Sequence, residues 1–491
     1  MQNPAQNHYD VLIIGAGLSG IGMACHVVTD FPHWKVAILE RRQAIGGTWD
    51  LFRYPGIRSD SDMLSFGYGF RPWNELQTLA DGPSIRQYVA DTAREYGVDK
   101  KIQYGLKITA MDWSSKDCRW SVHAIEEASG LENVFTCNFL ANCTGYYSYD
   151  QGFTPDFEGV DAFKGKVIHP QHWPEDLNYS GKRVVVIGSG ATAVTLVPAM
   201  ADNAEHVTML QRSPGYIFSL PATDGLARVL SKFMPKKWAY ALARQRRIMF
   251  QQVTYKIAKR YPKQAKSFLL NSVRKQLDGH ADMSHFTPKY NPWDERLCAV
   301  PDGDLFKAIK RGKASVVTDR IERFTEKGLR LQSGRELEAD IIITATGLQM
   351  QSFGGIALRV DGEEKHINER MTYKGVLLEG LPNLAWIFGY VNASWTLKAE
   401  IASNYFCRLL QLTTQSGFQS FTPRAPEGEA TNESMWCALQ SGYVLRARPF
   451  VPRQGRNLPW KVLNDYKRDR KMLLDEPVND EALEFRKANA G

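Results

Sequence analysis

Two glycine-rich loops are the residues of this chain whose types and spacing most directly suggest a chemical role. The first loop, Gly-Ala-Gly-Leu-Ser-Gly, follows a predicted short buried strand at residues 9–14 and precedes an apolar helical stretch at residues 21–28. Glycines at these positions permit a tight turn and let the backbone approach a pyrophosphate, which the start of the helix then faces. The candidate dinucleotide ligands in this loop are Gly15, Gly17, Ser19 and Gly20.

An acidic residue follows this loop at the distance that a ribose contact requires. Glu40 lies twenty residues after Gly20, at the end of a second predicted strand over residues 35–40. A carboxylate there accepts hydrogen bonds from ribose hydroxyls and repels a 2′-phosphate. A lone glycine pattern is weak evidence, but strand, loop, helix and acid together predict a dinucleotide without that phosphate, which suits FAD.

The second loop, Gly-Ser-Gly-Ala-Thr-Ala, has a different partner at the end of its second strand. It lies between predicted strands at residues 183–187 and 206–211, and the latter ends in Gln-Arg-Ser instead of an acid. An arginine there can pair with a 2′-phosphate, which predicts NADPH; a surface arginine at a strand end is the alternative. The candidate residues are Gly188, Ser189, Gly190, Ala191, Thr192, Ala193, Gln211, Arg212 and Ser213.

Two such units must be positioned by two separate dinucleotide-binding domains. We therefore expect the α/β class, with two Rossmann-like domains, in a chain whose 491 residues exceed the size of one core. Residues 1–147 should begin the FAD domain, and residues 148–345 should form the NADPH domain with a helical insertion at about 216–290. Residues 346–491 should complete the FAD domain and end in a loosely structured cap.

The composition excludes several classes of protein. The chain is 43% hydrophobic and 23% charged, which is ordinary for a soluble globular protein. It has no apolar run long enough to span a bilayer and no signal-peptide pattern, so we expect a cytoplasmic protein. Its seven cysteines form no Cys-x-x-Cys pair, so we expect small buried hydrophobes and no metal site.

Positive charge is concentrated in one segment. Residues 228–275 hold 14 Lys and Arg and no Asp or Glu, whereas the whole chain carries only +8. Aromatic residues such as Trp238 and Phe250 are interleaved with these charges, but no nucleic-acid-binding motif accompanies them. The simpler interpretation is a solvated helical face; the alternative is peripheral contact with an anionic membrane surface.

A further motif points to a family. Residues 163–174, Phe-Lys-Gly-Lys-Val-Ile-His-Pro-Gln-His-Trp-Pro, match the Phe-x-Gly-x-x-x-His-x-x-x-Trp-Pro fingerprint of type I Baeyer-Villiger monooxygenases at every position. Other flavin-containing monooxygenases usually lack the final Trp-Pro. The chain therefore resembles this family, and residues 46–63, 291–298 and 392–398 are similar to its ethionamide-activating bacterial subgroup.

The resemblance implies an activity. In the family, NADPH reduces FAD, O2 adds to form a C4a-peroxyflavin, and this oxidant converts ketones to esters or lactones and oxygenates sulfides. Arg296 matches the catalytic arginine, whose fixed charge stabilises the anions of the reaction, and Asp60 matches the carboxylate that orients it. The resemblance also implies cofactor contacts for Gly47, Thr48, Trp49, Arg58, Asp60, His169, Trp173 and Trp395.

One position departs from the family pattern, and two other functions stay open. Many members have a lysine that assists the coenzyme phosphate where this chain has Glu295, so selectivity for NADPH must rest on Arg212 and Ser213. One alternative is a flavin monooxygenase restricted to S- or N-oxygenation. The other is a flavin-bearing binding protein without catalysis. The sequence does not indicate the oligomeric state.

Overall fold

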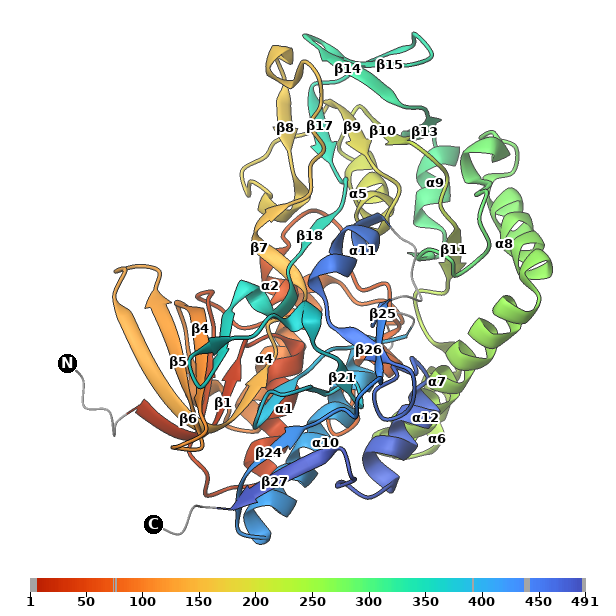
Figure 1. Cartoon of the computed structure of the whole chain (residues 1–491). Helices are drawn as coiled ribbons and strands as arrows, with labels where there is room; N and C mark the ends of the chain where they lie inside the picture. Colours follow the sequence, from red (N-terminus) through yellow and green to blue (C-terminus); the bar gives the residue numbers. More distant parts are fainter. Residues whose placement is uncertain (1–6, 74, 76, 391–392, 437–441, 488–491) are drawn as a thin grey trace.

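The computed structural model describes residues 7–73, 75, 77–390, 393–436 and 442–487 (Figure 1). Two large β-sheets, each parallel at its centre, are flanked by helices, so the expected α/β class is confirmed. Five of the cysteines are buried, as expected, and Cys118 is half-buried in a turn between two strands. Cys437 lies outside the described residues.

The first sheet has eleven strands, and β1 (His8–Ile14) lies at its parallel centre. β1 pairs in parallel with β2 (Val36–Leu39) on one side and β6 (Glu132–Asn142) on the other. Since helices and further strands cover both faces, the buried residues 11–14 of β1 form a continuous apolar run. α1 (Leu18–Asp30) follows β1 across the first glycine loop, which confirms the predicted strand, loop and helix.

The same sheet is extended by antiparallel strands and by strands from late in the sequence. β4 (Leu106–Ser114) and β5 (Arg119–Glu126) continue it beyond β6, and β19 (Ala357–Val360) pairs with β4. β23 (Leu384–Trp386) pairs with β6. Its remaining strands are β3 (Ile102–Gln103), β20 (Glu363–Glu364), β21 (Thr372–Tyr373) and β22 (Leu377–Leu378).

The second sheet is parallel throughout, in the order β13-β10-β9-β17-β8. α5 (Ala191–Ala201) follows β9 across the second glycine loop and packs against α9 (Asp304–Lys310), so the second predicted unit is also confirmed. The strands are β8 (Lys166–Ile168), β9 (Arg183–Ile187), β10 (His206–Gln211), β13 (Ala314–Thr318) and β17 (Ile341–Thr344).

Two short strands connect the two sheets. β7 (Tyr147–Gly152) and β18 (Leu348–Met350) pair antiparallel, and Figure 1 shows them in the middle of the molecule. Each begins shortly after a Thr-Gly pair, at residues 144–145 and 346–347. The chain therefore leaves the first sheet and returns to it along neighbouring paths. This arrangement supports the proposed division of the chain near residues 147 and 346.

A helical segment lies between β10 and β13 and forms one outer edge of the molecule (Figure 1). It consists of α6 (Gly225–Phe233), α7 (Lys236–Arg260) and α8 (Pro262–Leu277). The expected insertion is thus largely helical, but its first residues instead form β11 (Ile217–Leu220), which pairs with β12 (Cys298–Pro301).

Some of the positive charges of this segment pair with carboxylates from other parts of the chain. Arg244 pairs with Glu400, and Arg246 and Arg247 both pair with Asp224. Two further pairs are Lys256 with Asp465 and Lys259 with Asp294. Of the other nine cations, Arg228 donates to Thr223 Oγ1 at 3.2 Å. The remaining eight make no ion pair with a carboxylate that is recorded among the described residues.

The expectation of a loosely structured C-terminal cap is wrong. α10 (Trp395–Gln415) packs against α1, and the side chains of Phe421, Trp460 and Leu473 after it are buried in the same core. These apolar anchors are separated by single turns and short strands, so they show no regular period in the sequence. The elements are β24 (Phe418–Pro423), β25 (Ala430–Ser434), α11 (Gly442–Ala447), β26 (Arg453–Gly455), α12 (Tyr466–Arg470) and β27 (Leu483–Lys487).

The remaining elements are short or peripheral. They are α2 (Thr48–Leu51), α3 (Met63–Phe66), α4 (Gly82–Glu95), β14 (Ile321–Thr325), β15 (Gly328–Leu331) and β16 (Glu336–Glu338).

Within the described ranges, every helix is too short or too polar to cross a membrane.

Candidate active site

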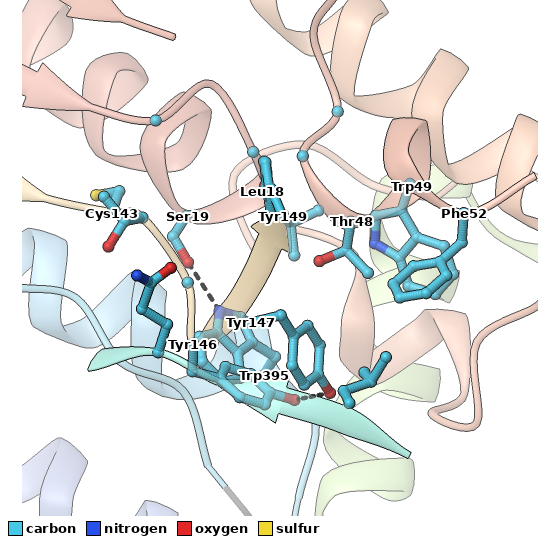
Figure 2. A pocket seen from close by; sticks show the side chains of 18 of the residues that line it. Leu18, Ser19, Thr48, Trp49, Phe52, Cys143, Tyr146, Tyr147, Tyr149 and Trp395 are labelled. Atoms are coloured by element: carbon cyan, nitrogen blue, oxygen red, sulfur yellow. Dashed lines mark hydrogen bonds between the residues drawn. The ribbon is translucent and has the colours of Figure 1, made fainter. Parts of the chain in front are cut away.

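A cavity of about 560 Å³ lies between the two glycine loops. Its wall combines the first loop, the 46–61 segment and the start of α5, together with aromatic residues from distant parts of the chain. Figure 2 shows these aromatic side chains around the first turn of α1. The predicted site residues in this wall are Gly15, Gly17, Ser19, Glu40, Gly47, Thr48, Trp49, Arg58, Asp60, Ala191, Thr192, Arg296 and Trp395.

The first loop has a shape that only glycine allows. Gly15 has φ +100°, and a Cβ there would lie 2.8 Å from the carbonyl oxygen of Cys143. A Cβ on Gly20 would lie 1.8 Å from the carbonyl oxygen of Gly15, so the helix packs directly on the turn. The N-cap of α1 is Gly17, which has no capping side chain. The first N–H groups of the helix therefore face a cavity, which is the arrangement that binds a phosphate group.

Glu40 supports this loop from within. Its side chain is 3% exposed; Oε2 accepts from the N–H of Ala16 at 2.6 Å, and Oε1 accepts from the N–H of Arg42 at 2.8 Å. Burial raises the pKa of Glu40, and the two backbone hydrogen bonds oppose this effect. Each carboxylate oxygen keeps a second lone pair, so the residue can hold the loop and still accept from a ribose hydroxyl.

Arg296 and Asp60 lie together in the wall of the cavity. Arg296 Nη1 is 3.4 Å from Asp60 Oδ2, and both side chains are about one third exposed. An ion pair this open contributes little to folding stability. Its significance is its position, because it places a permanent positive charge in the wall of the cavity that the first glycine loop and the start of α5 also line.

Arg58 connects the same wall to the second sheet. Its Nη1 is 2.7 Å from Oδ2 of Asp304, the first residue of α9. Burial raises the pKa of Asp304, and the Arg58 guanidinium opposes this effect. Arg58 therefore lines the cavity, as the sequence predicts, but its guanidinium forms an ion pair with α9 of the second unit.

The second loop begins α5 without a capping side chain, as the first begins α1. Gly188 has φ +135°, a Cβ there would lie 2.3 Å from the carbonyl oxygen of Ala345, and Gly190 is the N-cap. Ala191 and Thr192 reach the cavity, whereas Gly188, Ser189, Gly190 and Ala193 do not line it.

The three residues at the end of β10 differ in their surroundings. Gln211 is buried, and its Nε2 donates to the carbonyl oxygen of His285 at 2.7 Å and to Thr318 Oγ1 at 2.8 Å. Arg212 and Ser213 are exposed and lie outside the cavity wall. Gln211 therefore holds β10 in place, and the two exposed residues are the ones that could meet a phosphate.

The fingerprint residues lie at the connection between the sheets. His169 Nε2 is 3.1 Å from the carbonyl oxygen of Gly347, and its Nδ1 accepts from the N–H of Gln171 at 3.2 Å. These contacts fit a neutral ring with the proton on Nε2; burial lowers the pKa of His169, which favours the same form. Trp173 packs against the core of the second unit. Neither residue lines the cavity, although the sequence predicts cofactor contacts for both.

Comparison with known proteins agrees with this geometry. A family model described as flavin-binding monooxygenase-like matches residues 8–377. The chain belongs to this family.

Two relatives of this flavin-binding monooxygenase show how close the likeness is. MymA of Mycobacterium tuberculosis is 60% identical over 482 residues, which cover 97% of each chain. The FAD-containing monooxygenase EthA of the same species is 49% identical over 485 residues, 98% of this chain and 99% of EthA. The resemblance drawn from the sequence motifs is therefore confirmed.

Solved structures with the same fold are also known. A steroid monooxygenase bound to NADP superimposes with a TM-score of 0.78 at 23% identity, over 98% of this chain and 100% of that one. An open structure of cyclohexanone monooxygenase has a TM-score of 0.76 at 20% identity, with the same coverage. Because the sequence identity is this low, the two structures establish only the fold of this chain and not its activity.

Trp395 closes one side of the cavity of the monooxygenase. Its Nε1 donates to Ser19 Oγ at 2.7 Å, and its ring stacks on Tyr146 with centroids 4.9 Å apart (Figure 2). Phe388 meets the same indole edge-on at 4.8 Å. Trp395 and Tyr146 therefore give the cavity an aromatic wall beside the first turn of α1, and such a wall fits a flavin ring.

Several tyrosines in the cavity wall were missed by the sequence analysis. Tyr146, Tyr147 and Tyr149 all line the cavity, and Tyr147 donates to the hydroxyl of Tyr146 at 2.6 Å. The available signal was their clustering directly after the Thr-Gly pair at 144–145. Tyr390 also lines the cavity, and no local pattern indicated it.

Asp50 was missed as well, although it lies next to predicted residues. Its carboxylate is 2% exposed and pairs with Arg42 at 2.7 Å, Arg53 at 2.8 Å and Arg86 at 3.0 Å. Burial alone would raise the pKa of Asp50, but the hydrogen bonds from Arg42 and Arg86 bring it below its usual value. This cluster holds the 46–53 segment, which carries Gly47, Thr48 and Trp49, against the cavity.

Proposed function

We propose that the chain is an FAD- and NADPH-dependent monooxygenase that inserts one oxygen atom of O2 into ketones, giving esters or lactones, and oxygenates sulfides. The observation that carries the proposal is the Arg296–Asp60 pair, 3.4 Å apart in the wall of a cavity between two dinucleotide loops. The names of the relatives support FAD, and the NADP-bound steroid monooxygenase supports the nicotinamide coenzyme.

The residues present fit a flavin dinucleotide. The glycine turn and uncapped α1 suit a pyrophosphate, Glu40 suits a ribose, and the wall around Trp395 suits an isoalloxazine ring. When bound and reduced by NADPH, FAD supplies the activation of O2, which no amino-acid side chain can provide. The protein contributes binding, orientation, charge and exclusion of water.

Arg296 has the central role in this proposal. Oxygen insertion beside a carbonyl develops negative charge on oxygen, and a guanidinium stays protonated while it donates hydrogen bonds in a fixed plane. Asp60 orients that plane from 3.4 Å away. The same charge is not required when oxygen is transferred to a sulfur atom that carries no oxyanion, so the two reactions should depend on Arg296 to different extents.

The experiment is to compare Arg296→Ala with the wild type on a cyclic ketone and on a thioether, with products identified by mass spectrometry. We expect ester formation to fall by about 100-fold to 1000-fold, which is typical for loss of an oxyanion stabiliser. Reduction of the flavin by NADPH without oxygen should persist. Arg119→Ala is the control, because Arg119 is exposed on β5 and does not line the cavity.

Two outcomes would contradict the proposal. Ester formation by Arg296→Ala at the wild-type rate would remove Arg296 from the mechanism. A wild-type enzyme that oxygenates sulfides or amines but converts no ketone in a broad panel would restrict the function to S- or N-oxygenation.

A further inference from the structure

α7 has two apolar faces, and only one of them packs against the protein. Its inner face buries Ala239, Ala243 and Ile248. Its opposite face exposes Trp238, Leu242, Met249, Val253 and Ile257, each by 48–71%. A helix on the surface of a globular protein normally buries one apolar stripe and turns a polar face to water, so the second stripe requires a partner.

The exposed stripe continues onto the neighbouring helices. Phe233 at the end of α6 is 82% exposed, and Phe268 on α8 is 74% exposed. Of the 18 exposed large hydrophobic residues among the described residues, ten lie on α6 to α8 and an eleventh, Tyr261, joins α7 to α8. We call these eleven residues the outer apolar face. They are Leu226, Val229, Phe233, Trp238, Leu242, Met249, Phe250, Val253, Ile257, Tyr261 and Phe268. Because α6 to α8 lie at one edge of the molecule (Figure 1), these residues are grouped together, unlike hydrophobic residues that are scattered singly over a surface.

The charged side chains of α6 to α8 themselves are all positive. α6 to α8 contain no Asp or Glu. Exposed cations without a recorded carboxylate partner among the described residues lie on the same helices: Lys232, Lys236, Lys237, Arg260 and Lys263. Large aromatic and aliphatic side chains beside uncompensated lysines are the composition of a surface that inserts shallowly between anionic headgroups.

We propose that the outer apolar face docks the protein on the surface of an anionic lipid bilayer. Phe233 and Trp238 would enter the boundary between headgroups and acyl chains, and the lysines of α6 and α7 would meet the phosphates. A second copy of this chain fits the face less well, because a two-fold contact opposes the same patch on both subunits. That contact would place the cations of α6 to α8 against the same cations of the second copy, and these helices contain no Asp or Glu that could pair with them.

The position of α7 gives this docking a consequence for the cavity. On its inner face, Ile248 packs against Tyr390, which lines the cavity. Gln251 donates to Ser65 Oγ at 3.1 Å on the same side of the helix. α7 therefore lies between the proposed lipid surface and the cavity wall. Docking would bring the cavity close to apolar molecules dissolved in the bilayer, but binding to lipid does not rest on the proposed chemistry.

The test is sedimentation of the full-length holoenzyme with vesicles of phosphatidylglycerol and, separately, of phosphatidylcholine at low salt. We expect binding to phosphatidylglycerol only, weakened when NaCl is raised to about 0.5 M because salt screens the charges. Phe233→Ser/Trp238→Ser should weaken binding at least about 10-fold through lost apolar insertion. Lys232→Glu/Lys236→Glu should weaken it at least about 10-fold through lost attraction.

Matched controls separate this face from general effects. Leu131→Ser/Phe450→Ser removes two hydrophobic residues of 63% and 64% exposure elsewhere on the surface. Lys100→Glu/Lys116→Glu changes the net charge equally, away from α6 to α8. Both controls should bind like the wild type, and circular dichroism and flavin content should be the same for all variants.

Three results would overturn the proposal. The first is a wild type that does not sediment with phosphatidylglycerol vesicles, and the second is an equal loss in the control variants. The third is a dimer, seen by sedimentation velocity without lipid, that Phe233→Ser/Trp238→Ser dissociates while lipid binding is absent. In that case a second copy, and not a bilayer, covers the outer apolar face.

Discussion

Trp395 Nε1 donates a hydrogen bond to Ser19 Oγ across 2.7 Å, although 376 residues separate them in the sequence. The bond joins the first turn of α10 to the first turn of α1, directly beside the turn proposed to bind the flavin pyrophosphate. Both residues line the cavity, and a Cβ on Gly389 would collide with the indole at 2.2 Å. The hydrogen bond to Ser19 and the close approach of Gly389 therefore fix the orientation of the indole in the cavity wall.

We predict that Trp395→Phe weakens FAD binding, because it keeps an aromatic ring but removes the donor to Ser19. Loss of one hydrogen bond should lower the free energy of unfolding by about 1 kcal/mol. The measurements are thermal unfolding of the apoprotein and titration of the apoprotein with FAD. Trp113→Phe is the control, since Trp113 Nε1 donates to Ser115 Oγ at 3.1 Å and neither residue lines the cavity. FAD affinity should be unchanged in the control, and an equal loss in both variants would contradict the prediction.

A second prediction concerns Asp50, whose pKa is held below its usual value by surrounding arginines. Because the folded pKa is lower than the unfolded value of about 3.9, Asp50 stabilises the fold fully above that pH. This contribution is lost as the pH falls from the unfolded pKa through the folded pKa. Asp50→Asn should cost about 1–3 kcal/mol at neutral pH, since three partly exposed arginines lose their hydrogen-bonded carboxylate.

The measurement for Asp50 is urea unfolding of both proteins between about pH 3 and pH 7, the range around the unfolded pKa. The difference in unfolding free energy should be largest at neutral pH and should shrink at the acidic end. Glu363→Gln removes an exposed carboxylate that pairs with Lys365 and should change stability little. A difference for Asp50→Asn that does not vary with pH would contradict the electrostatic explanation.

A third prediction concerns coenzyme selectivity. Glu295 lies near enough to Arg212 for the guanidinium to oppose the rise in the pKa of Glu295 that burial causes. A carboxylate there competes with a 2′-phosphate for Arg212 and repels it. We therefore expect Glu295→Lys to lower the KM for NADPH by about 10-fold, the effect of one good charge-assisted contact, and to leave the KM for NADH unchanged.

Two comparisons complete this test. Arg212→Ala should raise the KM for NADPH and bring it close to that for NADH. Glu322→Gln removes an exposed acid of the same unit and should affect neither coenzyme. If Glu295→Lys improves NADPH and NADH equally, the effect comes from general charge, and Arg212 does not read the 2′-phosphate.

The parts of this molecule that could be predicted from the sequence depend on neighbouring residues. The strands, turns and helices around Gly15 and Gly188 were predictable because a βαβ unit brings its strand, glycines and acid together within about 30 residues. The pairing of Arg296 with Asp60 was expected only through resemblance to a family. No local pattern connects residues 236 positions apart.

The parts that could not be predicted depend on contacts between distant segments. The arginines around Asp50 come from a loop, a turn and a helix, so no spacing indicates the cluster. The sequence shows no acidic partner for the positive charges of residues 228–275, because the partners of the paired cations, such as Glu400 and Asp465, lie outside this segment. The C-terminal residues were expected to be loose because their buried anchors have no regular period.

The last prediction concerns a buried group behind the cavity. Tyr390, which lines the cavity, donates to Asp469 Oδ2 at 2.7 Å, and Lys398 Nζ lies 3.4 Å from Asp469 Oδ1. Lys398 also donates to the carbonyl oxygen of Lys374 at 3.2 Å. Burial lowers the pKa of Lys398, and Asp469 opposes this effect. The hydroxyl of Tyr390 is therefore committed to Asp469, and only the ring of Tyr390 faces the cavity as a fixed surface.

We predict that Lys398→Met lowers the free energy of unfolding by about 3–5 kcal/mol, because it leaves the carboxylate of Asp469 buried without its cation. Lys398→Met/Asp469→Asn should recover part of this loss, since the double variant has no buried charge at the site. The coupling is measured by a double-mutant cycle in urea. Tyr390→Phe should leave the ring in place and reduce stability by only about 1 kcal/mol. If Asp469→Asn and Lys398→Met instead add without coupling, the two groups do not act as a pair, and Tyr390 is held by packing against Ile248 and Leu397.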